Sequence, residues 1–346
     1  MRILMVGPDR SVQGGISGVV NNYYRAGLDK KVQLHYIGTM VDGKKVKKLI
    51  KALQSYIRFA LCVSKYDIIH VNMAADASYY RKIYFICVSK LFHKKLIIHQ
   101  HGGDVEHFFD SDVKGIRRKI RYKILDMADA FLVLAPIWKD FFGNIIPKEK
   151  IYVLPNGIEV PKYDVSKKDY SDCNIAYIGR ICREKGIQEL YDAVETLKQE
   201  FPSIHLYLGG KWESEELHSI QIDKDEYISY LGWLGTEQKK NILQKCSVFV
   251  MPSYFEGQCI AVLEAMSYGC ATIATRVGGL QQTFCNGEDG VLIEPQSAGA
   301  LIKALRNLLL DEQYKRKVGT AGRNKVKSKF DIQTIMEQLL EIYRNM

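Results

Sequence analysis

Short apolar runs alternate with longer segments of helical periodicity along almost the whole chain. The runs in the first half comprise residues 3–6, 32–37, 68–71, 96–99, 130–134 and 151–154. The pattern restarts with residues 174–178, 205–208, 227–231, 248–250, 272–273 and 290–293. Parallel strands need crossover helices between them, so this alternation is typical of βαβ units and parallel sheets.

A polar stretch, residues 161–169, separates the two sets of runs and begins with a proline. We therefore predict an α/β protein with two Rossmann-like domains, residues 1–168 and 169–330, that face each other across a cleft. Ligands of such sheets bind outside the carboxyl ends of the strands. The loops that follow the strands are thus where chemistry is expected.

Composition excludes several other classes of protein. The 346 residues suffice for two domains, and 47% hydrophobic with 25% charged residues is ordinary for a globular chain. No apolar run reaches the roughly 18 residues of a membrane span, and the apolar start is too short for a signal peptide. The eight cysteines lack CxxC spacing, so we expect buried thiols in a reducing cytosol and no zinc site.

The net charge of +10 is unevenly distributed. Residues 1–168 contain 29 Lys and Arg against 15 Asp and Glu, whereas residues 169–346 contain 20 against 24. A basic half favours an anionic partner such as phosphate, nucleic acid or acidic lipid. The alternative is that these basic residues only keep the protein soluble and bind no anionic partner.

Two loops carry residues suited to phosphate. Gly14 and Gly15 follow the first strand and precede a helix, which allows close backbone approach to a phosphate, although a plain turn would look the same. Their spacing is not that of a nicotinamide-binding fingerprint. Arg180 and Lys185 follow the first strand of the second half and suit a diphosphate, because arginine chelates two oxygens and lysine adds a mobile charge. Solvated surface charge is the alternative for this pair.

The segment from Met251 to Gly269 is the most informative stretch. Pro252 and Gly257 indicate an irregular loop, and a helix is expected from about Gln258 to Gly269. The amides of residues 257–260 would then point at a ligand. Glu256 and Glu264 would lie roughly 12 Å apart along the helix, too far for an acid/base pair, so we expect them to contact different parts of one long ligand. Alternatively, Glu264 reaches solvent at the helix edge.

These elements together resemble the retaining glycosyltransferases of the large GT4 family, which have the GT-B architecture. The E-x7-E element is matched by Glu256 and Glu264, and the diphosphate-binding pair by Arg180 and Lys185. The other matching motifs are the Gly-Gly loop at residues 14–15, the His-Gly motif at His101, and Pro-Asn-Gly at residues 155–157. The resemblance covers nearly the whole chain, with the elements in the expected order.

The resemblance implies roles for these residues. Arg180 and Lys185 would neutralise the departing diphosphate, and Glu264 would bind the ribose hydroxyls. Donor contacts are further implied for Gly14, Gly15, Glu256, Gly257, Gln258, Cys259, Ile260 and Leu234. Leu234 belongs to the turn Gly232-Trp233-Leu234, which resembles the family's base-binding loop. Glu256 and His101 are the expected catalytic residues. His99 is an alternative to His101, because strand alternation puts both on the same face. The choice of His101 rests on the glycine that follows it, Gly102, which completes the His-Gly motif. Gln258 and Cys259 depart from the family's usual residues, which leaves the donor open.

The implied activity is transfer of a sugar from a nucleotide-diphosphate donor, a UDP-sugar favoured over a GDP-sugar, to a glycan or polyprenyl-diphosphate-linked acceptor in cell-surface polysaccharide assembly. No cofactor and no metal are expected. The resemblance also implies that the C-terminal helix, within residues 331–346, crosses back to the first domain. Two alternatives are a nucleotide-sugar epimerase of similar fold and a nucleic-acid-binding protein. The basic runs lack an RNA-binding or helix-turn-helix signature, so we expect no nucleic acid.

Two basic segments raise the question of a membrane. Residues 44–61 place apolar side chains at positions 46, 49, 50, 53, 57 and 61, on one face of a helix, with lysines elsewhere. Residues 114–123 form a second basic run. We hypothesise that the first domain rests on the cytoplasmic face of an anionic membrane. The alternative is that the apolar face packs on the sheet and the lysines face water.

Overall fold

The computed structural model describes residues 1–111, 114–213 and 226–346 and divides into two compact units. Unit 1 comprises Met1–Glu159 with Asp331–Met346, and unit 2 comprises Val160–Phe330. The predicted boundary at residue 168 is wrong, because the stretch before it packs on unit 2. There the Arg323 guanidinium donates hydrogen bonds to the carbonyls of Pro161 and Tyr163, and the Lys168 ammonium donates one to the carbonyl of Leu243.

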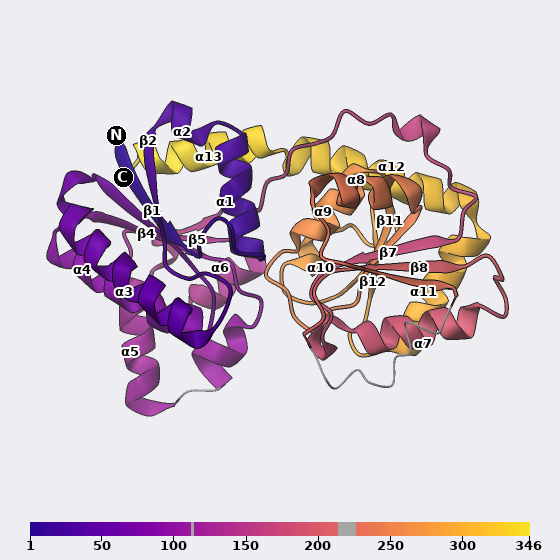
Figure 1. Ribbon diagram of the computed structural model, residues 1–346, viewed down its shortest axis with the longest axis horizontal. Helices are drawn as coiled ribbons and strands as arrows, with labels where there is room; N and C mark the ends of the chain where they lie inside the picture. Colours follow the sequence, from indigo (N-terminus) through magenta and orange to yellow (C-terminus); the bar gives the residue numbers. More distant parts are fainter. Residues whose placement is uncertain (112–113, 214–225) are drawn as a thin grey trace. The chain divides into compact units, whose positions relative to one another are not determined.

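Unit 1 is built on a sheet of six parallel strands in the order β2-β1-β3-β4-β5-β6 (Figure 1). The strands are β1 (Arg2–Gly7), β2 (Gln33–Gly38), β3 (Ile68–Met73), β4 (Lys95–Gln100), β5 (Ala130–Val133) and β6 (Ile151–Val153). Every residue of β3 is buried, as expected for a central strand with helices on both faces.

Helices cover both faces of this sheet. They are α1 (Gly15–Arg25), α2 (Leu28–Lys31), α3 (Lys45–Cys62), α4 (Ala77–Leu91), α5 (Gly115–Asp126), α6 (Pro136–Phe142) and α13 (Ile332–Arg344). The connections through α3, α4, α5 and α6 all move across the sheet in one direction, whereas the connection through α1 moves in the other. Because such crossovers are right-handed, α3 to α6 share one face and α1 lies on the opposite face.

The C-terminal helix α13 completes unit 1. It packs beside α1 (Figure 1), and the Tyr343 hydroxyl lies 2.6 Å from His70 Nδ1 in the sheet. Gly157 lies directly against the start of the helix, since a Cβ at this glycine would be 3.0 Å from the Ile332 Cα. The Gly157 carbonyl also accepts a hydrogen bond from the Asn22 amide of α1. The Pro-Asn-Gly motif thus seats the last helix on the first sheet.

Unit 2 repeats the architecture with six parallel strands in the order β12-β11-β10-β7-β8-β9. The strands are β7 (Asn174–Ile178), β8 (His205–Gly209), β9 (Ile228–Gly232), β10 (Val248–Met251), β11 (Ala271–Thr275) and β12 (Val291–Ile293). The helices are α7 (Ile187–Leu197), α8 (Thr236–Lys245), α9 (Ile260–Ser267), α10 (Leu280–Thr283), α11 (Ala298–Leu310) and α12 (Glu312–Lys329). Two parallel sheets, each covered by helices, are the α/β fold that the alternation predicted.

One expectation from the sequence is wrong, and one alternative considered there does not hold. The cysteines are not all buried, because Cys87 and Cys285 are exposed. Helix α3 does not turn its apolar face to the sheet: it buries Ala52, Ser55 and Phe59 instead. No helix in the described part of the chain is long and apolar enough to cross a bilayer.

Candidate active site

The loops after two neighbouring strands of unit 2 are tied together at the carboxyl edge of its sheet. Strands β7 and β10 pair, so the loop 179–186 and the loop 252–259 lie beside each other. The Tyr254 amide donates a 2.8 Å hydrogen bond to the carbonyl of Glu184. Gly186 has φ +68°, and a Cβ there would lie 2.1 Å from the Pro252 carbonyl oxygen. Only glycine permits both that backbone conformation and that close approach.

An ion pair joins the two loops. The Lys185 ammonium contacts Glu256 Oε1, and both side chains are nearly buried, with 13% and 14% exposed. The Ser253 hydroxyl donates a second, 3.2 Å hydrogen bond to the same carboxylate oxygen. Burial acts to lower the pKa of Lys185, but the Glu256 carboxylate outweighs it and the pKa lies above its usual value. Lys185 is therefore a fixed cation at neutral pH.

Arg180 lies in the same loop, closer to solvent. Its guanidinium pairs with Glu213 Oε2 at 3.0 Å, and the backbone beneath it is fixed by the buried Tyr177 hydroxyl, which donates to the Arg180 carbonyl at 2.6 Å. The positive charge of Arg180 is close enough to lower the pKa of Lys185. The predicted pair of cations thus shares one electrostatic neighbourhood.

The helix expected to start near Gln258 begins two residues later. Helix α9 starts at Ile260 and Cys259 is its N-cap, because Gly257 and Gln258 still belong to the buried loop. The amides of its first turn are those of residues 260–262, which have no acceptor within the helix. Burial, with a smaller contribution from Glu256, raises the pKa of the Cys259 thiol to about 12. The residue at the helix tip is consequently a neutral thiol.

Glu264 extends from α9 toward α8, where Lys239 contacts its Oε1. About a quarter of each side chain is exposed, so this pair reaches solvent at the edge of the sheet. Leu234, the expected base-loop residue, has its side chain buried instead. A Cβ at Gly209 would lie 2.4 Å from Leu234 Cδ1. The neighbouring Trp233 is 48% exposed and is the side chain of this turn available to a ligand.

In unit 1, Gly14 and Gly15 precede α1 at the carboxyl end of β1. Gly14 is the N-cap in extended conformation, and Gly15 is the first helical residue. A Cβ on either glycine would meet no atom within 4 Å. The fold itself does not require glycine at these positions, so a requirement there would come from something that approaches the helix start.

His101 follows β4 at the same edge of unit 1. Its Nε2 lies 2.9 Å from Asn72 Oδ1, while the Asn72 amide donates to the Val6 carbonyl. Asn72 therefore accepts the Nε2 proton, and His101 Nδ1 is an acceptor with no partner among the described residues. Burial lowers the pKa of His101 to about 3, which keeps the ring neutral.

His99, the rival of His101, lies deeper in a buried cluster. Its ring stacks 4.0 Å from that of His101, and its Nδ1 lies 3.3 Å from His70 Nε2. Burial lowers the pKa of His70 to about 3 and that of His99 well below its usual value, and neighbouring histidines lower both further. His99 is completely buried whereas His101 is partly exposed. His101 is thus the histidine of this cluster that lies nearer the surface, although its Nδ1 atom is itself buried.

This cluster predicts that the protein loses stability in mild acid. Between about pH 6.5 and pH 3 the unfolded chain binds protons at His70, His99 and His101 that the folded chain does not, so the free energy of unfolding falls as the pH falls. The slope is about 1.4 kcal/mol per pH unit for each histidine. Urea unfolding of a Trp212→Phe/Trp233→Phe background, in which Trp138 reports on unit 1, measures it. His99→Phe should reduce the slope, and His35→Gln, at an exposed position, should leave it unchanged.

Sequence reasoning missed the groups that hold the predicted residues. Glu213, Lys239 and Ser253 contact Arg180, Glu264 and Glu256 respectively, and Asn72 fixes the His101 ring. These partners come from distant segments with no recognisable spacing. The parallel order of the strands could have found Ser253 and Asn72, because both lie at carboxyl strand ends.

Two family models match consecutive parts of the chain. Residues 25–161 match the model described as Glycosyltransferase Family 4, and residues 164–325 match that described as Glycosyl transferases group 1. Among curated relatives, the glycogen synthase of Mycobacterium tuberculosis is 25% identical over 199 residues, 56% of this chain and 48% of that protein. The capsular polysaccharide biosynthesis glycosyltransferase CapM of Staphylococcus aureus is 27% identical over 255 residues, 68% of this chain and 62% of that protein. The matches thus span about half to two thirds of these relatives' length.

Solved structures support the fold. HepE of Anabaena in complex with UDP-glucose aligns with a TM-score of 0.80 at 18% identity, and the alignment covers all of both chains. Sucrose-phosphate synthase of Thermosynechococcus elongatus aligns with a TM-score of 0.78 at 21% identity, over 99% of this chain and 98% of that one. With two parallel six-stranded sheets and both family models matched in order, the chain has the GT-B fold and belongs to the group 1, family 4 glycosyltransferases.

Proposed function

We propose that the protein is a retaining glycosyltransferase that takes a sugar from a nucleotide-diphosphate donor and passes it to a glycan or lipid-linked glycan in cell-surface polysaccharide assembly. The observation that carries the proposal is the cation pair Arg180 and Lys185 beside the start of α9, at the carboxyl edge of unit 2. Two cations and a helix N-terminus form a site for a group with two phosphates.

In the proposed reaction this site must stabilise the charge that develops on the leaving group. As the glycosidic bond to the nucleotide breaks, negative charge grows on the departing diphosphate, and the sugar takes on oxocarbenium character. In our proposal Arg180 and Lys185 stabilise that growing charge together with the amides of residues 260–262. Preorganised donors of this kind contribute about 3 kcal/mol each. The Glu256 pair supports this role, because it holds the Lys185 ammonium in place before a ligand arrives.

The remaining predicted residues take the other parts of the donor in the same proposal. Glu264 accepts hydrogen bonds from the ribose hydroxyls, and Glu256 with the loop 257–259 positions the sugar. The turn of Trp233 and Leu234 contacts the base, with Trp233 as the exposed ring. Glu264 must then share its carboxylate between Lys239 and the ribose, which its partly exposed position permits.

Unit 1 is proposed to act on the reacting end of the donor. The Gly14–Gly15 helix start suits a phosphate, since no atom of the described residues lies within 4 Å of a Cβ placed on either glycine. His101 supplies a neutral ring whose buried Nδ1 has no partner among the described residues, and we assign that atom a hydrogen bond with a sugar hydroxyl. A neutral ring also adds no charge to an oxocarbenium-like state.

The relatives support the choice of donor and pathway. Structures of HepE contain UDP and UDP-glucose, which supports a UDP-sugar over a GDP-sugar here. CapM is a glycosyltransferase of capsular polysaccharide biosynthesis, and a lipopolysaccharide 1,2-N-acetylglucosaminetransferase of Salmonella typhimurium is 24% identical over 272 residues. Both support an acceptor on the way to the cell surface. We propose no cofactor and no divalent metal.

A panel of UDP-, GDP-, ADP- and TDP-sugars in a thermal-shift assay tests the proposal, followed by NMR of the product formed with the stabilising donor. We expect one nucleotide class to raise the melting temperature, and the anomeric configuration of the donor to be kept in the product. Glu264→Ala should abolish the shift. Failure of every nucleotide sugar to bind would contradict the proposal. Conversion of the donor to an epimer without an acceptor would assign epimerase activity instead.

The two N-terminal glycines allow a test that separates function from folding. Gly15→Ala should leave the melting temperature unchanged or slightly higher, because the added Cβ meets nothing and alanine favours helix. If a phosphate approaches this helix start, the same methyl group should lower kcat/KM for transfer by about tenfold, since close backbone approach requires glycine. Gly299→Ala, at the start of α11 with equally open surroundings, is the matched control: its melting temperature should likewise be unchanged or slightly higher, and its kcat/KM should not change.

A further inference from the structure

Helix α3 has two apolar faces, and the structure uses only one of them. The inner face buries Ala52, Ser55 and Phe59 against the sheet, where Phe59 is completely buried. Lys51 also turns inward and pairs with Asp9 at 2.9 Å, which fixes the helix to the loop after β1. The packing of α3 on unit 1 is therefore complete without its second apolar face.

The second face, which we name the α3 stripe, consists of six large apolar side chains that are all exposed. Their exposed fractions are 69% for Val46, 72% for Leu49, 52% for Ile50, 59% for Leu53, 55% for Ile57 and 75% for Leu61. At about 100° per residue these positions fall on the side of α3 opposite to Ala52 and Phe59. A continuous apolar stripe on a helix that is already packed indicates an interaction surface.

The charge around the α3 stripe selects the kind of partner. Helix α3 contains no acidic residue, and exposed basic side chains flank the stripe at Lys45, Lys47, Lys48 and Arg58. Helix α5, on the same face of the sheet, exposes Ile116 and Ile120 among further arginines and lysines. An apolar stripe on a helix whose charged residues are all basic is the pattern of helices that lie in the headgroup region of an anionic bilayer.

We propose that the α3 stripe docks unit 1 on an anionic lipid surface, with the apolar side chains inserted among the acyl chains and the lysines at the headgroups. A second copy of the chain is a poorer occupant, because a self-complementary contact would bring these lysines together. The proposal does not depend on the donor-binding residues, none of which lies in α3. It accounts for a lipid-linked acceptor, because the enzyme would then work where such an acceptor is held.

Sedimentation with vesicles tests this directly and requires no catalysis. The protein is mixed with vesicles of phosphatidylcholine alone and with vesicles of equal parts phosphatidylcholine and phosphatidylglycerol. We expect the partition coefficient to be at least about tenfold higher on the anionic vesicles and to fall as salt is added. Leu49→Ser/Leu53→Ser and Lys45→Gln/Lys47→Gln should each lower it about tenfold or more.

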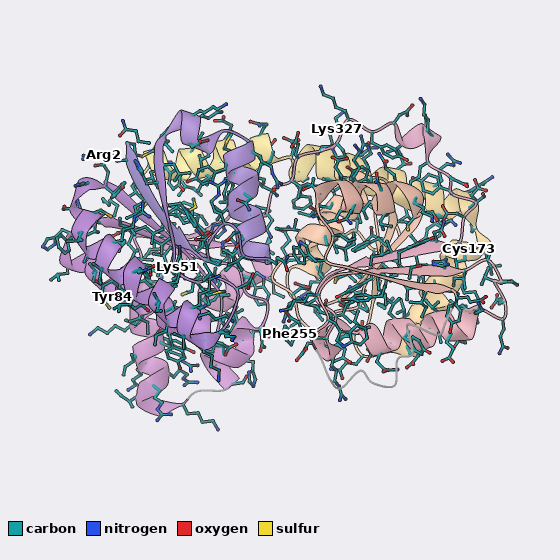
Figure 2. All side chains as sticks on the ribbon, viewed as in Figure 1. Arg2, Lys51, Tyr84, Cys173, Phe255 and Lys327 are labelled. Carbon is teal, nitrogen blue, oxygen red and sulfur yellow. The ribbon has the colours of Figure 1, made fainter. Side chains whose placement is uncertain are left out.

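Matched control variants distinguish docking through the α3 stripe from nonspecific adsorption to vesicles. Leu310→Ser removes an equally exposed leucine of α11, and Lys327→Gln/Lys329→Gln removes two exposed lysines of α12, of which Lys327 is labelled in Figure 2. Both should bind vesicles like the unchanged protein. All these side chains are exposed, so melting temperatures should stay the same.

Insertion has its own signature. In a Leu53→Trp protein the tryptophan emission should shift to shorter wavelength on anionic vesicles, which loose electrostatic adsorption would not cause. Equal and negligible binding to both vesicle types, or binding unchanged in both α3 variants, would overturn the proposal. Concentration-dependent dimerisation that Leu49→Ser/Leu53→Ser abolishes, without vesicle binding, would assign the stripe to a second copy.

Discussion

Replacing Lys185 with methionine should lower kcat/KM for sugar transfer about a hundredfold to a thousandfold. The ammonium is fixed against Glu256 and lies within electrostatic range of Arg180, so it is a preorganised donor for the departing diphosphate. Loss of one such donor typically raises a barrier by about 3–4 kcal/mol. Steady-state kinetics with the donor found by the thermal-shift panel give the ratio of kcat/KM between the unchanged protein and the variant. Lys240→Met, which removes the lysine of the exposed pair with Glu237, should leave it unchanged.

A loss of activity in this variant needs to be separated from a loss of folding. Lys185→Met removes the ammonium partner of the nearly buried Glu256 carboxylate, to which the Ser253 hydroxyl still donates, and this costs stability. Lys185→Met/Glu256→Gln removes both charges and should recover most of that stability while transfer remains as slow. A double variant with restored transfer would show that Lys185 acts on the fold and not on the diphosphate.

Replacing Gly186 with alanine should be among the most destabilising single substitutions in unit 2. The left-handed conformation costs alanine about 1 kcal/mol, and the new Cβ would lie 2.1 Å from the Pro252 carbonyl oxygen. That collision involves backbone on both sides and cannot be relieved by rotating a side chain. We expect a total loss of about 3 kcal/mol in the free energy of unfolding, measured by urea denaturation.

Gly232→Ala isolates the conformational part of that loss. Gly232 has φ +63°, close to the value at Gly186, but a Cβ there meets nothing within 4 Å. Its loss of about 1 kcal/mol should be well below that of Gly186→Ala. Equal losses at the two positions would mean that the two loops are not held together as described. Transfer should also suffer in Gly186→Ala, since Lys185 and Glu256 lie on the loops that separate.

The folded architecture could be predicted because each of its causes is local. Buried parallel strands appear as short apolar runs, as at residues 68–71. The crossover helices between them are recognised by apolar residues that recur with the period of a helix. The domain boundary was harder, because the polar stretch at residues 161–168 looks like a linker but is held by Arg323, a residue far along the chain. Composition cannot reveal such a contact.

The candidate site could be predicted as a set of residues but not as a set of pairs. Spacing placed Arg180, Lys185 and Glu256 in loops that follow strands, and Glu264 inside the next helix, where the structure has them. It could not show that each of these charges has a partner of opposite sign, since Glu213 and Lys239 lie on other loops and helices. The start of α9 was placed two residues too early for a similar reason: loop packing, not a capping signal, delays the helix.

These ion pairs have a consequence for binding. Arg180, Lys185 and Lys239 are each paired with a carboxylate before a ligand arrives. A diphosphate must compete with Glu213 for Arg180 or bind the remaining donors of both cations. Its affinity should therefore depend on both cations together and fall as salt is added.

The central claim is that Arg180 and Lys185 recognise a diphosphate. Calorimetric titration with a nucleoside diphosphate and the matching monophosphate, for the base selected by the thermal-shift panel, tests it most directly. Our account predicts that the unchanged protein binds the diphosphate at least about tenfold more tightly than the monophosphate, and that Arg180→Met/Lys185→Met loses this preference while still binding the nucleoside. Equal affinity for the two nucleotides in the unchanged protein, or an undiminished preference in the double variant, would contradict it.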